Sequence, residues 1–195
     1  MLAVCATRLE SADNPLARVS AICTIKARNL ALASYSLALD ALAQEAGAVF
    51  RPLIETLELL AYLRDDPSRV DEAIEGRLPS AGKRAQVIGG RFRKWREYLN
   101  SHSSHFGFTL QSVRHLLVGN TFELRVTQPF SEAVLRENLK SLFAVLFFCA
   151  AEAILTLAAV VPGAAVDLAT RAETVRTSGA RLYTIRPSDS DPPSD

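Results

Sequence analysis

A run of 20 mainly apolar residues, Leu142 to Val161, constrains the fold of this chain more than any other sequence feature. The run is long enough for a helix that crosses a bilayer, and only Glu152 and Thr156 interrupt it. It continues without a break from the amphipathic segment 131–141, and its ends lack the Lys and Arg clusters and aromatic belts of membrane spans. Glu152 and Thr156 form one narrow polar stripe. The run therefore predicts a central core helix, with a membrane span as the alternative.

Composition places the chain among single-domain globular proteins. A chain of 195 residues can bury a core, and 49% hydrophobic with 22% charged residues is typical of a folded domain. The formal net charge of +1 argues against a globally basic nucleic-acid binder but leaves room for a local basic patch. Residues 1–10 lack the pattern of a signal peptide, and the three widely spaced cysteines suit a reducing compartment. We therefore expect a cytoplasmic protein.

Apolar residues at helical spacing predict further helices on both sides of the central one. Asn14-Pro15 has the cap-plus-proline pattern of a helix start, and Gly47 is expected to end that helix. Asp66-Pro67 repeats the start pattern for a short helix that Gly76 ends. The other helices are expected from residue 49 onward, over 80–99, over 131–161 and over 165–176.

The segment 109–128 changes from helical spacing to an alternating pattern. Residues 121–126 alternate polar and apolar side chains strictly, which is typical of a half-buried strand. Gly119-Asn120 precedes them as a two-residue turn, and residues 112–118 are the expected partner strand. The segment therefore predicts a small β-hairpin.

Together these patterns predict a mainly α fold, a single-domain helical bundle with a small β-hairpin insertion. The bundle is expected over 14–176, after an N-terminal segment 1–13. No apolar residue follows Ile185, and the last ten residues are rich in proline, serine and aspartate. This composition predicts a flexible, disordered C-terminal tail over 177–195.

Residues 91–105 concentrate the residue types that point to chemistry. Six cations precede His102, namely Lys83, Arg84, Arg91, Arg93, Lys94 and Arg96. An arginine paired with a histidine can cleave RNA without a metal, because imidazole moves the proton and guanidinium stabilises the charge on the phosphate. The catalytic candidates are Arg96 and His102. The RNA-binding candidates are Arg91, Arg93 and Lys94.

The relative orientation of Arg96 and His102 limits this hypothesis. Residues six apart on a continuous helix point about 120° away from each other. The two side chains therefore converge only if the helix ends at Asn100-Ser101, as we expect from the poor helix formers there, or if a second protomer contributes one of them. The alternative is a solvated basic face with a capping or packed histidine.

An all-helical chain with an arginine, five residues and a histidine near a helix end, as in Arg96 to His102, resembles the HEPN superfamily. The resemblance implies metal-independent endoribonuclease activity in bacterial defence or toxin–antitoxin systems. It also implies a homodimer whose motifs face each other, with Arg96 and His102 as the catalytic pair.

Other segments are similar to a group of uncharacterised bacterial helical proteins. The similarity rests on Arg51-Pro52 with Glu55, on Asp65-Asp66-Pro67 and on the segment 95–105. Tyr98 and His105 match the tyrosine and the histidine of the last of these, which implies His105 as an alternative catalytic histidine. The resemblances cover residues 15–160 in outline.

The rest of the sequence carries no further reaction motif. Its histidines lack clustered cysteines or acids, so we expect no metal and no cofactor. Arg51 and Glu55 are expected to form an intrahelical ion pair. The expected function is RNA cleavage or RNA binding, with RNA as the partner. The alternative is a non-catalytic helical module that binds a protein. We expect a homo-oligomer that does not associate with membranes.

Overall fold

The computed structural model describes residues 1–102, 116–119, 123–125, 127 and 130–184. Within them the chain forms eight α-helices, one short 3-10 helix and no strand, which confirms the mainly α prediction. The helices are α1 (Leu2–Glu10), α2 (Pro15–Leu39), α3 (Ala43–Asp65), η1 (Pro67–Arg69), α4 (Val70–Ile74), α5 (Ala81–Val87), α6 (Arg93–His102), α8 (Glu132–Val160) and α9 (Val166–Thr184).

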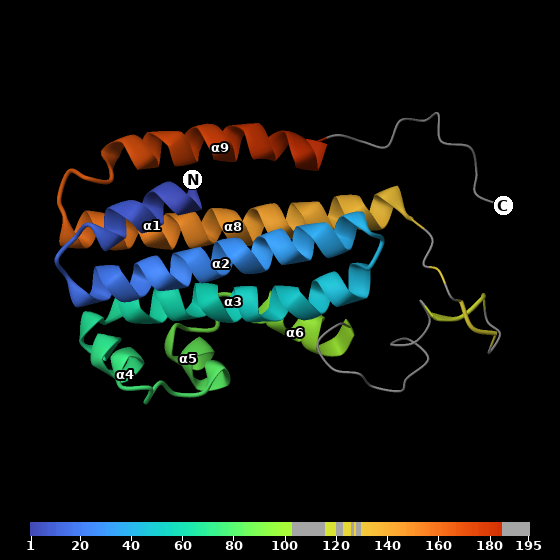
Figure 1. Ribbon diagram of the computed structural model, residues 1–195, viewed down its shortest axis with the longest axis horizontal. Coiled ribbons are helices and arrows are strands. Elements are labelled where there is room, and N and C mark those ends of the chain that lie inside the picture. Colours follow the sequence, from blue (N-terminus) through green and yellow to red (C-terminus); the bar gives the residue numbers. More distant parts are fainter. Residues whose placement is uncertain (103–115, 120–122, 126, 128–129, 185–195) are drawn as a thin grey trace.

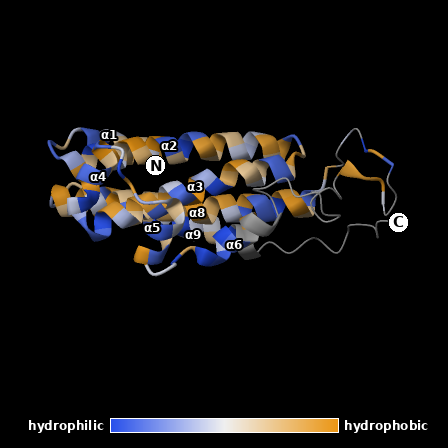
Figure 2. Cartoon of the chain, turned by 90° about the horizontal axis from the view of Figure 1, so that it is seen from below, coloured by the Kyte–Doolittle hydropathy of each residue, from blue (hydrophilic) through white to orange (hydrophobic). Residues whose placement is uncertain are grey.

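The three long helices α2, α3 and α8 lie side by side along the length of the bundle (Figure 1). Each contacts the other two, so they enclose a common core. The largest fully buried side chains of α3 fill this core, namely Leu53, Ile54, Leu57, Leu60 and Leu63. Figure 2 shows α2 along one face of the bundle, so only one side of α2 is covered by its own chain.

Helix α2 begins where the sequence predicts and ends earlier. The Asn14 side chain accepts a hydrogen bond from the Ala17 N–H at 3.1 Å, and Pro15 occupies the first helical position. The helix does not run to Gly47 as predicted. It ends at Leu39 because Ala41 adopts a left-handed backbone, with φ of +64°, and the chain reverses there into α3.

Helix α8 contains the long apolar run and contacts α1, α2, α3 and α9. Ser131 caps it as predicted, since its side chain accepts from the Val134 N–H at 3.4 Å. By length and composition it is apolar enough to cross a membrane, and 44% of its most apolar window is buried inside the bundle. Its polar stripe is also buried, because Glu152 is 8% exposed and Thr156 is fully covered.

Both ends of the chain contain more helix than predicted. The N-terminal segment 1–13 is part of the bundle, because α1 packs Cys5 and Leu9 against α8. The last helix does not end near residue 176 but continues to Thr184, so residues 177–184 do not belong to a flexible tail. The rest of the predicted tail, 185–195, lies outside the described residues.

The predicted β-hairpin over 109–128 is not seen as strands. Much of this segment lies outside the described residues. The described part has one isolated antiparallel bridge, between Leu117 and Leu124, and two backbone hydrogen bonds of 2.7 and 2.9 Å beside it. The described residues therefore do not show the predicted hairpin as a pair of strands, and the rest of the prediction lies outside them.

The predicted helix over 80–99 is divided into α5 and α6. Gly89 and Gly90 both adopt left-handed backbone, with φ of +72° and +64°, and a right-handed helix does not continue through two such residues. The predicted end at Asn100-Ser101 is also wrong, because α6 continues to His102. The rings of Phe92 and Trp95 both lie edge-on to Phe148 of α8, with ring centroids 6.0 and 5.9 Å apart, and this packing holds the start of α6 on the bundle.

Candidate functional site

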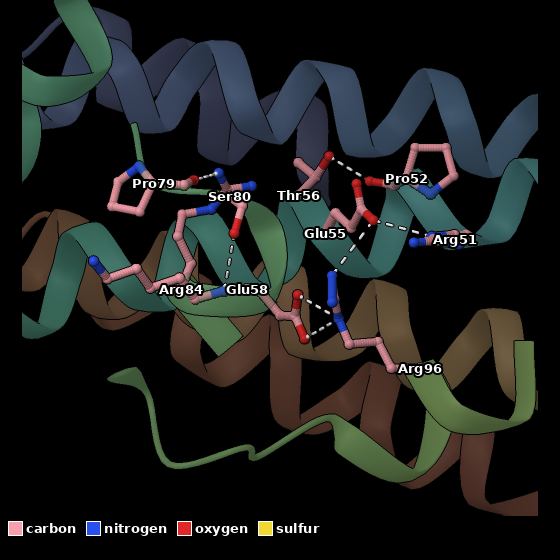
Figure 3. Close-up of polar contacts among 10 residues, drawn as sticks. Arg51, Pro52, Glu55, Thr56, Glu58, Pro79, Ser80, Arg84 and Arg96 are labelled. Carbon is pink, nitrogen blue, oxygen red and sulfur yellow. Dashed lines mark hydrogen bonds and ion pairs between the residues drawn. The ribbon is translucent and has the colours of Figure 1, made fainter. Parts of the chain in front are cut away.

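A network of arginine and glutamate side chains joins α6 to α3 (Figure 3). Arg96 donates through Nε to both carboxylate oxygens of Glu58, at 3.0 and 3.1 Å. Its Nη2 atom also lies 3.4 Å from Oε1 of Glu55. The guanidinium of Arg96 is therefore occupied by two carboxylates of its own chain.

The local sequence of α3 presents these carboxylates on one face. Glu55 and Glu58 are three residues apart, so they are neighbours on the helix surface. Arg51, one turn before Glu55, donates to Glu55 at 3.1 Å, which confirms the predicted intrahelical pair. Pro52 interrupts the backbone hydrogen bonds of α3, and its carbonyl accepts from the Thr56 hydroxyl at 2.7 Å (Figure 3).

The pair between Arg96 and Glu58 is nearly closed to water. The side chain of Glu58 is 1% exposed and that of Arg96 is 14% exposed. Burial raises the pKa of Glu58, because a carboxylate loses its hydration there, and the positive charge of Arg96 partly opposes this shift. Arg84 is a further cation near Glu58, and its guanidinium donates to the Pro79 carbonyl at 2.6 Å. This arrangement fixes α5 and α6 on α3.

A second network lies at the other end of α3. Arg64 donates to both oxygens of Glu152 on α8, and its Nη2 atom lies 3.1 Å from Asp65 Oδ1. Arg91 forms an ion pair with Asp65, and its Nη1 atom lies 4.0 Å from Glu152 Oε1. The carboxylate of Glu152 interrupts the apolar run of α8, and these two arginines neutralise it inside the bundle.

The structure disperses the cations that the sequence places together. Arg91 and Arg96 belong to separate networks, on Asp65 and on Glu58. Arg93 is exposed and lies 3.3 Å from Glu97, and Lys94 is exposed. The structure therefore divides the four cationic candidates between two ion-pair networks and the exposed face of α6.

Of the histidine candidates, the structure describes only the backbone of His102, at the end of α6. Because α6 continues to His102, the backbone positions of Arg96 and His102 lie on one helix, about 120° apart around its axis. The condition for their convergence within one chain, an end of the helix at Asn100-Ser101, is not met. The side chain of His102 and the whole of His105 lie outside the described residues.

The three cysteines do not supply a nucleophile. All three are buried with free thiols. Burial raises the pKa of Cys23 to about 11 and raises the pKa of Cys149 further, so both thiols stay protonated and unreactive at neutral pH. No group of three or more His, Cys, Asp or Glu side chains that could hold a metal occurs among the described residues.

Glu58, the centre of the first network, is not among the residues predicted from the sequence. Glu58 follows Ile54 by one turn and lies beside Leu57, within the apolar face of α3. A carboxylate in such a face is seldom buried unless it is paired. This position was the signal available in the sequence, and it pointed to a cation on a neighbouring helix.

The outer face of α2 carries a row of exposed side chains that no described part of the chain covers. Ile22 is 70% exposed, Leu32 is 50% exposed, and Ile25 and Leu39 are also exposed. Two polar residues, Asn29 and Ser36, are exposed in the same row. We call these six residues the α2 seam.

The chain matches no protein-family model, and no curated protein or solved structure is similar to it. The features of the chain that bear on its function are the two ion-pair networks and the α2 seam. The resemblance to the HEPN superfamily stays a prediction from the motif of Arg96 and His102.

Proposed function

We propose that this chain is a non-catalytic helical interaction module that binds the apolar face of a partner helix along the α2 seam. The observation that carries the proposal is the spacing of the seam. The seam consists of Ile22, Ile25, Asn29, Leu32, Ser36 and Leu39. The intervals between successive residues alternate between three and four positions. This is the heptad spacing with which one helix packs on another.

The exposure of the seam distinguishes it from an ordinary core stripe. Single exposed apolar residues are normal on a protein surface, whereas a continuous exposed row at heptad spacing marks an interaction surface. Residues on the opposite side of α2 point into the bundle, among them Cys23, Ala27 and Ala31, which are buried. Helix α2 therefore has two apolar sides, and its own chain covers one of them.

A hollow beside the first half of the seam adds room for the side chains of a docked helix. It has a volume of about 490 Å³ and lies between α1 and α2. Its apolar lining is formed by Ile22 and Ile25 of the seam with Ala6 and Ala21, and the polar side chains of Thr7, Glu10 and Arg18 complete it. Apolar side chains of a partner helix that packs on the seam would enter this hollow, as in the binding of a helix in a groove.

RNA cleavage or RNA binding of the HEPN type is the second proposal. It is supported by the exposed side chains of Arg93 and Lys94 on α6, which are available to phosphate groups. Catalysis by Arg96 requires its guanidinium to leave Glu58 and Glu55, so the buried network favours the interaction module. Incubation with RNA in chelator, beside an Arg96→Lys variant, distinguishes these two functions.

Site-specific photo-crosslinking tests the interaction module. A photoreactive amino acid replaces Leu32 in the seam, and a matched control replaces Val87 on α5, which is 49% exposed. In the cytoplasm, where we expect the protein, position 32 should give one discrete crosslinked species that position 87 does not. The absence of any species specific to position 32 overturns the proposed function.

A further inference from the structure

We infer that the partner of the α2 seam is α2 of a second copy of this chain, and that the two helices lie parallel and in register. The inference rests on the proposed function and names its partner. It is carried by the side chains of the seam and by the charges that flank it, since both suit a copy of the same helix.

Asn29 favours a second copy in parallel register. It occupies the same heptad position as Ile22 and Ser36, and its side chain is exposed, with a single hydrogen bond of 3.3 Å from its neighbour Arg28. In a parallel pair in register, each residue of the seam meets its own copy. The two Asn29 side chains can then hydrogen-bond to each other, because each amide has a donor and an acceptor. A buried asparagine of this kind fixes the register of two paired helices.

An antiparallel pair satisfies Asn29 less well. Aligning Ile22 with Leu39 of the partner subunit places Asn29 opposite Leu32 of the partner subunit. The amide then loses water without gaining a hydrogen-bond partner, which costs about 1–3 kcal/mol. A helix from an unrelated protein needs a matching polar residue at this position, whereas a second copy has one.

The charges beside the seam are compatible with parallel pairing. Helix α2 contains no Asp or Glu, and its exposed cations Lys26 and Arg28 flank the seam on opposite sides. In parallel register, Lys26 faces Ala21 of the partner subunit and Arg28 faces Ala33 of the partner subunit. No like charges are therefore opposed between Ile22 and Leu39. A third exposed cation, Arg18, lies one turn before Ile22 and meets its own copy, and each Arg18 forms an ion pair with Asp13 of its own chain at 3.1 Å.

The C-terminal end of the seam adds a favourable polar contact. Tyr35 is 43% exposed and flanks Leu39. In parallel register its hydroxyl group faces the carboxylate of Asp40 of the partner subunit, to which it can donate a hydrogen bond. The seam from Ile22 to Leu39 extends over about 27 Å of helix, so this contact closes one end of a long interface.

Disulfide crosslinking tests the register. Ser36→Cys in the full chain places two thiols next to each other across the axis in a parallel pair, within reach of a disulfide. The three natural cysteines are buried, so wild type provides the background. The matched control is Ala33→Cys, an exposed residue one turn before Ser36 that does not face its own copy.

We expect mild oxidation to convert most of the Ser36→Cys protein, and little of the Ala33→Cys protein or wild type, into a covalent dimer. Equal crosslinking of both variants, or none for Ser36→Cys, overturns the parallel register. The photoreactive residue at position 32 separates the two proposals. A crosslinked species that contains a different protein refutes the second copy and retains the interaction module, whereas no species refutes both.

Discussion

At the scale of single residues, Arg96 has a structural role that the Arg96–His102 motif does not predict. Its guanidinium neutralises the carboxylate of Glu58, whose side chain is only 1% exposed. We expect Arg96→Met to reduce the free energy of unfolding by about 3–5 kcal/mol, because Glu58 is left buried and unpaired. Urea unfolding followed by circular dichroism measures this loss.

The matched control removes both charges. We expect the double variant Arg96→Met/Glu58→Leu to recover most of the lost stability, since apolar side chains of similar size replace a buried ion pair at little cost. A double variant that is as unstable as the single one contradicts the structural task of Arg96.

Glu58 should also make stability depend on pH. Its raised pKa means that the folded chain keeps this proton to higher pH than the unfolded chain, where the pKa of glutamate is about 4.3. Between the two values the folded state binds more protons, so the free energy of unfolding falls as pH rises. We therefore expect wild type to lose stability relative to Glu58→Gln between about pH 4 and about pH 7.

Urea unfolding of wild type and Glu58→Gln at both pH values provides the measurement. The other acidic groups titrate in both proteins and cancel in the comparison. If the difference in free energy of unfolding between wild type and Glu58→Gln stays constant, or if wild type gains stability relative to Glu58→Gln as pH rises, burial does not raise the pKa of Glu58.

Ala41 is the residue that ends α2 in a left-handed conformation, with φ of +64°. This conformation costs an alanine about 1–2 kcal/mol, and glycine adopts it freely. We expect Ala41→Gly to stabilise the protein by about 1 kcal/mol in thermal unfolding. Ala158→Gly, at an exposed position of α8, should instead destabilise it by up to about 1 kcal/mol. Destabilisation by both changes contradicts this account.

At the scale of elements, the packing of α9 on α8 depends on one glycine. A Cβ atom at Gly179 would overlap the ring of Phe143. We expect Gly179→Ala to destabilise the protein by about 1–3 kcal/mol, because the ring or the helix must move. Gly82→Ala on α5 is the control, since a Cβ atom there meets nothing within 4 Å, and it should stabilise the protein by about 0.5 kcal/mol. Equal effects of the two changes in urea unfolding contradict the close contact.

The elements also show what the sequence could predict. Helix starts at Asn14-Pro15 and Ser131 were predictable, because a capping side chain acts on its own helix. Helix ends were harder, since Ala41 has no local signal for its left-handed backbone. Gly89-Gly90 is unfavourable inside a helix, but the sequence does not show that both glycines are left-handed and divide the predicted helix.

The candidate site was predictable only in part, because the sequence shows contacts within one helix but not contacts between helices. The pair of Arg51 and Glu55 is local to one helix and was predicted, whereas the pair of Arg96 and Glu58 joins residues 38 positions apart. Its formation depends on how α6 packs on α3. Sequence spacing along α6 alone could not show that Arg96 faces a carboxylate of another helix.

At the scale of the whole molecule, the bundle buries two carboxylates and leaves a mainly apolar row exposed. Glu58 and Glu152 are neutralised by arginines inside the chain, while the α2 seam faces outward. A monomer of this kind exposes the apolar surface that a partner helix would bury. This arrangement supports the proposed interaction module.

Sedimentation equilibrium of wild type beside Leu32→Lys and the control Val87→Lys tests this account most directly. The two replaced residues have nearly equal exposure, 50% and 49%, but only Leu32 belongs to the seam. The account predicts that wild type and Val87→Lys have twice the chain mass of 21.2 kDa, and that Leu32→Lys is a folded monomer. A monomeric wild type, or a Leu32→Lys protein that dimerises as wild type does, would contradict it.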